Sequence, residues 1–258
     1  MRSVGPLVGC LVIALCAAFT AGAQAAPEIG RCVTVARSGR LYMGHYVDKA
    51  CNTEASSQEI SNGGHSNKYE WEVALGPDGG SYTSNGMFSE IKTRRFPVNC
   101  KKTVGKGAIL STDTVDAKFT FVGCELGTHT KEECHSNGAG AGEIDTGNLL
   151  GTVIEEPGKE VFIEYEPPRG EGPWAQFECA PHDRPKVEVE GEVTAKLTGI
   201  VNVSSKKGRI EAGATVGEQF LLAEYLTLEH EEEEEEAIIT VTQSLKFGEK
   251  YEVRTAEA

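Results

Sequence analysis

The sequence contains little that would place the protein in a membrane or on nucleic acid. After residue 25 it has no apolar run of the roughly 20 residues that a membrane-spanning helix needs. Positive charge is also scarce, because 25 lysine and arginine residues stand against 39 acidic residues. Such a balance repels phosphate backbones and anionic membrane surfaces. We therefore expect no nucleic-acid partner and no stable membrane insertion.

Common catalytic motifs are also missing. The chain has no G-x-S-x-G sequence, which forms the nucleophile elbow of many hydrolases. The glycine-rich stretch 138–142 lacks the Lys-Ser/Thr ending of a P-loop. These absences argue against nucleophilic hydrolysis and phosphate binding at a glycine-rich loop, and we expect no cofactor.

Residues 1–25 have the pattern of a secretory signal peptide. Arg2 precedes an apolar run from Leu7 to Phe19, and Ala23-Gln24-Ala25 matches the cleavage pattern of signal peptidases. Cleavage after Ala25 leaves 233 residues and, since it removes only one charged residue, changes the formal net charge from −14 to −15. We therefore expect a secreted, extracellular protein. Lipidation at Cys10 is the weaker alternative, because most of the apolar run follows that cysteine.

The cysteines that follow the cleavage site predict a disulfide framework. An even number of cysteines in an exported chain is typical of such a framework, although six cysteines allow 15 connectivities. The six are Cys32, Cys51, Cys100, Cys124, Cys134 and Cys179. Sequence proximity favours the pairs Cys32–Cys51 and Cys124–Cys134, which leaves Cys100–Cys179 as a long-range bond.

Alternating apolar and polar residues predict β-strands through most of the chain. The clearest case is Lys186–Thr198, where valines, Ala195 and Leu197 share one face and charged residues the other. A second run, 238–247, alternates in the same way, and 118–124, 160–166 and 174–179 do so less regularly. The stretch 219–230 fits either a strand or a helix, and its neighbours favour a strand.

Turn residues between these runs support an all-β fold. Asn-Gly or Asp-Gly pairs occur at 62–63, 78–79, 85–86 and 137–138, where tight turns need left-handed conformations. No linker rich in proline or serine divides the chain, so we expect one secreted domain over 26–258. Residues 28–60 are expected to form a disulfide-closed hairpin packed on it. The predicted fold is an antiparallel β-sandwich or barrel-like domain stapled by disulfides.

Several segments resemble a family of secreted, cysteine-containing proteins. They are Glu28-Ile29-Gly30-Arg31-Cys32-Val33, 44–51, Lys68-Tyr69-Glu70-Trp71-Glu72, 121–125 and 140–144. Together they resemble a group of β-rich proteins from soil actinobacteria that has no assigned function. The resemblance implies an exported β-rich protein and carries no catalytic or binding residues.

Two candidate sites contain residue types that can carry chemistry. His129 and His135 lie next to Cys124 and Cys134, which gives a set of zinc-type ligands, but an oxidising compartment favours a disulfide there. Paired carboxylates are the second candidate, because glycoside hydrolysis uses two of them. Such pairs occur at Glu164 and Glu166 and along 188–192, where a solvated strand face is the favoured explanation.

Two further features admit a binding interpretation. The run 231–236 consists of six glutamates, which predicts a solvated loop between two strands more than a cation site. Aromatic side chains can stack on sugars, although core packing is the more common role. The candidates are Tyr42, Tyr46, Tyr69, Trp71, Tyr82 and Trp174.

The sequence thus favours a non-catalytic binding or structural protein outside the cell. Its expected partner is a cell-wall or other extracellular polymer, or another secreted protein. The alternative is a hydrolase that uses paired carboxylates on an extracellular polysaccharide.

Overall fold

The computed structural model describes residues 26–255 except 94–96, 128–131, 157, 159, 170, 181–185, 214–218 and 227–232. The signal-peptide prediction for residues 1–25 lies outside the described residues. The regular structure of the described residues is nearly all strand, and every ladder between named strands of the main sheet is antiparallel. The prediction of an all-β, disulfide-bonded fold is therefore confirmed.

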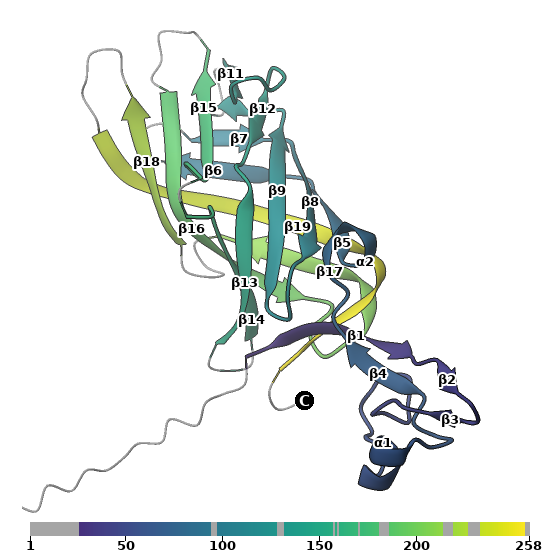
Figure 1. The fold of residues 1–258 in the computed structure, drawn as a ribbon. Coiled ribbons are helices and arrows are strands. Elements are labelled where there is room, and N and C mark those ends of the chain that lie inside the picture. The colour runs from purple at the N-terminus through teal and green to yellow at the C-terminus, as the bar shows by residue number, and fades with distance from the viewer. Residues whose placement is uncertain are drawn as a thin grey trace, which may run out of the picture.

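The strand pairings close into a ring that forms the larger part of the fold (Figure 1). Each strand is hydrogen-bonded to the next, and the last pairs with the first. The members, in order around the ring, are β5 (Ser81–Gly86), β8 (Lys102–Ile109), β9 (Thr114–Val122), β13 (Leu149–Glu156), β14 (Glu160–Glu166), β16 (Lys186–Thr198), β17 (Ser205–Ala212) and β19 (Glu233–Arg254). The arrangement is a barrel whose strands have one face inside and one face outside.

The long strands β16 and β19 continue beyond this ring and take part in a second one. Figure 1 shows β19, in yellow, curving along the molecule. The other members of the second ring are β6 (Ser89–Thr93), β7 (Val98–Cys100), β10 (Glu125–Leu126), β11 (Glu132–His135), β15 (Ala175–Cys179) and β18 (Gln219–Leu226). The short strand β12 (Glu143–Asp145) pairs with β9.

Alternation along each strand explains which side chains fill the barrel. In β9 every second residue is buried, from Val115 to Phe121, as expected for a strand with one face in a core. The inward aromatic rings contact one another: Phe119 meets Tyr165 edge to face at 5.5 Å, and Tyr82 lies 5.6 Å from Phe247. The interior of the first ring is a packed core, so the chemistry available to a ligand lies on the outer face.

The N-terminal part projects from one end of the barrel (Figure 1). Its elements are β1 (Glu28–Thr34), β2 (Arg37–Ser38), β3 (Leu41–Tyr42), α1 (Ser57–Asn62) and β4 (Tyr69–Glu72). The short helix α2 (Gly76–Gly79) follows β4 and lies against β5 and β8 of the barrel. The first half of β1 pairs with the end of β19, and its second half pairs with β4. Only β2 and β3 form a hairpin here, and the partner of β1 lies beyond residue 60. The disulfide Cys32–Cys51 joins β1 to the segment between β3 and α1.

The remaining disulfides differ from the predicted pairs. The bonds are Cys100–Cys124 and Cys134–Cys179, so the prediction of Cys124–Cys134 with Cys100–Cys179 was wrong. The four residues lie in one row, three of them in β7, β11 and β15 and Cys124 directly before β10. Neighbouring strands are about 4.8 Å apart, so Cys100 and Cys179 at the two ends of the row are separated by about 14 Å. A disulfide needs Cα atoms within about 7 Å, which excludes the predicted long-range bond.

Most of the predicted strands are confirmed, and two loop predictions are not. Lys186–Thr198 is β16, and the ambiguous stretch is strand from Gln219 to Leu226. Asn85-Gly86, predicted as a turn, belongs to β5, because both residues pair with β8. The loop interpretation of the acidic run is wrong for Glu233–Glu236, which pair with β18 as the start of β19.

Candidate functional site

An open hollow of about 550 Å³ lies on the outer face of the first ring. Strands β5, β8 and β9 form most of its wall, and the segment directly before β13 adds the rest. The lining residues are Ser81, Tyr82, Thr83, Lys106, Gly107, Ala108, Asp116, Ala117, Lys118 and Asn148. Ser81, Thr83 and Lys106 are exposed to solvent, so a ligand reaches the hollow without any movement of the chain.

Antiparallel register brings the polar residues of the hollow together. Thr83 lies opposite Lys106, and Lys106 lies opposite Lys118. Residues directly opposite one another in an antiparallel sheet point to the same face. In the next row Ser81 lies opposite Ala108, and these two short side chains leave the space that a longer residue would fill.

Close packing beneath the hollow depends on Gly107. A Cβ atom on this residue would overlap the carbonyl oxygen of Asp116 and approach the Tyr82 hydroxyl. The same hydroxyl donates a hydrogen bond of 2.7 Å to that carbonyl oxygen. Burial raises the pKa of Tyr82 well above its ordinary value, and Tyr165 and Asp116 add to the effect. The tyrosine therefore stays neutral and acts as a structural donor.

The hollow contains two ammonium groups and one carboxylate. Asp116 accepts a hydrogen bond from the backbone N–H of Ala108, which holds its side chain against β8. Lys118 approaches Asp145 only to 3.9 Å. Lys106 has no carboxylate within 4 Å among the residues that the structure describes. The arrangement offers hydrogen-bond donors to a ligand and lacks the second carboxylate that glycoside hydrolysis needs.

The predicted carboxylate pairs lie elsewhere on the barrel. Glu164 and Glu166 are on the outer face of β14, where Glu164 lies opposite Thr194 of β16. Burial raises the pKa of Glu164, and the charges of Glu192, Glu166 and Glu156 raise it further. These side chains do not line the hollow.

Further along β16, Glu188 is already engaged. It accepts a hydrogen bond from the Gln176 side-chain amide and lies 3.2 Å from the Lys186 ammonium. Both contacts occupy the Glu188 carboxylate within the protein.

The predicted zinc ligands do not form a metal site in the part of the chain that is described. Cys124 and Cys134 are both in disulfides, so neither supplies a thiolate. His135 lies 3.4 Å from Glu178 across the β11–β15 pair, and His129 lies outside the described residues. No group of three or more potential metal ligands occurs among the described residues.

The aromatic residues proposed as a sugar platform do not form an exposed row. Tyr82 and Trp174 are buried in the core. One face of Trp71 is covered by the Arg254 guanidinium, which lies 3.8 Å from the ring centroid. Tyr42 has Arg37 and a lysine near its ring. A cation on an aromatic face is a stabilising contact. Tyr46 and Tyr69 are half-buried and lie opposite one another in an isolated bridge.

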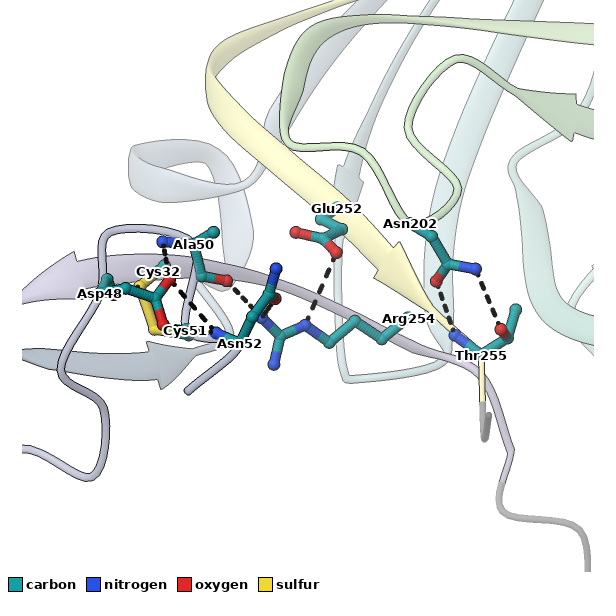
Figure 2. A network of polar contacts seen from close by, with 9 residues as sticks. All are labelled: Cys32, Asp48, Ala50, Cys51, Asn52, Asn202, Glu252, Arg254 and Thr255. Carbon is teal, nitrogen blue, oxygen red and sulfur yellow. Dashed lines mark hydrogen bonds and ion pairs between the residues drawn. A yellow bond between two sulfur atoms is a disulfide. The ribbon is translucent and has the colours of Figure 1, made fainter. Parts of the chain in front are cut away.

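Arg254 joins the end of β19 to the disulfide-closed N-terminal loop (Figure 2). Its Nη2 atom donates to the carbonyl oxygen of Ala50 at 2.6 Å and to Oδ1 of Asn52 at 3.3 Å. Its Nε atom lies 3.7 Å from Glu252, which is only 8% exposed. Burial raises the pKa of Glu252, while the Arg254 charge lowers it in part. Sequence reasoning missed this contact, because its partners are some 200 residues apart.

Asp48 organises the loop to which Arg254 is hydrogen-bonded (Figure 2). Its carboxylate accepts hydrogen bonds from the backbone N–H groups of Ala50 at 2.8 Å, Asn52 at 3.2 Å and Thr53 at 2.6 Å. Burial is the largest single influence on the pKa of Asp48 and raises it, but these donors together hold the pKa below its ordinary value. On the other side of β19, Asn202 and Thr255 exchange two hydrogen bonds of 3.1 Å. This network is an anchor with its polar groups satisfied internally, and the hollow remains the candidate site.

Comparison with known proteins adds no family to these observations: no protein-family model, curated protein or solved structure matches the chain. No helix in the described ranges combines the length and apolar character required to cross a membrane.

Proposed function

We propose that the protein is a secreted, non-catalytic module that binds a segment of an extracellular polymer in the hollow on β5, β8 and β9. The observation that carries the proposal is an open hollow with ammonium, hydroxyl and amide donors and a single carboxylate. Three disulfides support export, because such bonds persist in oxidising compartments. The resemblance to exported proteins of soil actinobacteria points in the same direction.

The test uses oxidised protein, residues 26–258, mixed with a crude cell-wall and polysaccharide fraction. Loss of protein from the supernatant and release of soluble sugar are measured together. We expect depletion without release. The variant Thr83→Tyr places an aromatic ring in the hollow and should abolish depletion. The control Thr240→Tyr makes the same change at an exposed position of β19 that does not line the hollow, and it should leave depletion intact.

One observation favours a hydrolase as the second candidate. The raised pKa of Glu164, next to other carboxylates, is the property of a general acid in glycoside hydrolysis. Release of soluble sugar that Glu164→Gln eliminates, and that Thr83→Tyr leaves unchanged, would support this function and refute the binding module.

A further inference from the structure

A line of lysines crosses the outer face of the barrel through the hollow. Four successive pairings connect it: Lys207 lies opposite Lys246, Lys246 opposite Thr83, Thr83 opposite Lys106, and Lys106 opposite Lys118. We call these four lysines the lysine row. Thr83 stands in its middle, with one pair of lysines on either side.

The geometry of the row follows from strand spacing. Strands β17, β19, β5, β8 and β9 are consecutive neighbours, and strands lie about 4.8 Å apart, so the row extends for about 19 Å along the curved sheet. The two lysines of each pair are one strand spacing apart. Like charges at directly opposite positions repel and destabilise a sheet, and here this happens twice in the same line.

Little negative charge within the described part of the chain compensates the row. Lys106, Lys207 and Lys246 are exposed and have no carboxylate within 4 Å there. Lys118 has Asp145 at 3.9 Å. Asp116 is the one carboxylate among the residues that line the hollow, and it accepts a hydrogen bond from the backbone N–H of Ala108. Three unpaired cations on one line give the described surface a local positive potential, although the protein has a net charge of −14.

We infer that the lysine row binds a linear acidic polysaccharide, with one sugar in the hollow and carboxylates of neighbouring sugars on the two lysine pairs. This inference rests on the proposed function and names the class of its ligand. The short hydroxyl and methyl side chains of Ser81, Thr83 and Ala108 suit a sugar ring. The negative charge of the whole protein repels densely charged polyphosphates and nucleic acids, so a polymer with one charge per ring fits better.

The test compares two polymers with the same backbone: polygalacturonate and its fully methyl-esterified, neutral form. Binding is measured by calorimetry at two salt concentrations with oxidised residues 26–258. We expect tighter binding of polygalacturonate, weakened by salt because exposed charges are screened. The variant Lys106→Gln/Lys246→Gln should weaken the binding of polygalacturonate about tenfold. Each exposed ion pair that is lost contributes up to about fivefold.

The matched control is Lys92→Gln/Lys102→Gln, which removes the same charge from exposed lysines outside the row. It should leave affinity unchanged, and near-ultraviolet circular dichroism confirms the fold of both variants. The two polymers could instead bind equally, with no effect of Lys106→Gln/Lys246→Gln and loss of binding in Thr83→Tyr. This result would overturn the inference of an acidic ligand and would still support the binding module. Tighter binding of inorganic polyphosphate would also overturn it. If neither sugar polymer binds, the inference is wrong, and wall-fraction depletion still decides the proposed function.

Discussion

Cys124 lies directly opposite Cys134 on the neighbouring strand, yet each is bonded to a different cysteine. The Cys134 amide donates a 3.0 Å hydrogen bond to the carbonyl oxygen of Cys124, and the β10–β11 register continues through both residues. Their disulfide partners, Cys100 and Cys179, lie on the outer sides of this pair. Two disulfides therefore stand side by side, and both are buried.

This adjacency predicts thiol–disulfide exchange in the variant Cys100→Ser. The freed Cys124 thiolate attacks Sγ of Cys134, forms the Cys124–Cys134 bond and releases Cys179 as a thiolate. Alkylation followed by non-reducing peptide mapping should find the label on Cys179. A label on Cys124 would show that the Cys134–Cys179 bond does not exchange with the Cys124 thiol.

The double variant Cys100→Ser/Cys124→Ser has no free thiol at this place and is the control for exchange. It should lose about 3.5 kcal/mol of unfolding free energy, because the bond closes a loop of 24 residues. Urea unfolding measures the loss, and a change below about 1 kcal/mol would contradict the chain-entropy argument.

Arg254→Ala should loosen the N-terminal part from the barrel. The variant loses the stacking on Trp71 and the hydrogen bond to Ala50, and it leaves Glu252 without its cation. Contacts of this kind predict a loss of about 2–3 kcal/mol, together with a red shift of Trp71 fluorescence, because water gains access to the ring. Arg209→Ala, which removes an exposed arginine paired with Glu211, should change stability by less than about 1 kcal/mol.

Asp48 should make stability depend on pH at the acidic end. Its pKa is below the ordinary 3.8, so its stabilising effect is complete above 3.8 and is lost as the pH falls through the lower folded value. Asp48→Asn should therefore be less stable than the native protein at pH 7, by about 1 kcal/mol. The difference should close on acidification towards pH 2. Thermal unfolding over this range provides the measurement, and a difference that stays constant with pH would exclude an ionic role.

Gly30→Ala should disturb the junction between β1 and β4. A Cβ atom at this position overlaps the indole of Trp71, so the ring must move away from Arg254. Overpacking of this kind costs about 1–3 kcal/mol. Gly248→Ala is the matched control, because a Cβ atom there meets nothing within 4 Å. Similar effects of the two substitutions on the melting temperature would contradict the clash.

Local pattern was sufficient to predict some of the strands. The alternation in Lys186–Thr198 and in Glu160–Glu166 predicted β16 and β14 with their observed bounds, because a strand with one buried face needs a period of two. Local pattern failed where pairing across the sheet overrode it. Asn85-Gly86 has turn chemistry but pairs with β8, and Glu233–Glu236 has a loop-like charge but pairs with β18.

The amino-acid sequence by itself determined an all-β, disulfide-bonded chain of acidic character, since these properties depend on composition and on neighbouring residues. Sequence proximity also predicted the Cys32–Cys51 bond, but tertiary structure alone decided how the other four cysteines pair and which lysines line up. Lys106 and Lys118 are neighbours through the consecutive strands β8 and β9. They share a row with Lys207 and Lys246 only because β5 pairs with β19, which is far away in the chain. A shift of one residue in any of these pairings would turn a lysine to the opposite face, and no local signal in the sequence specifies that choice.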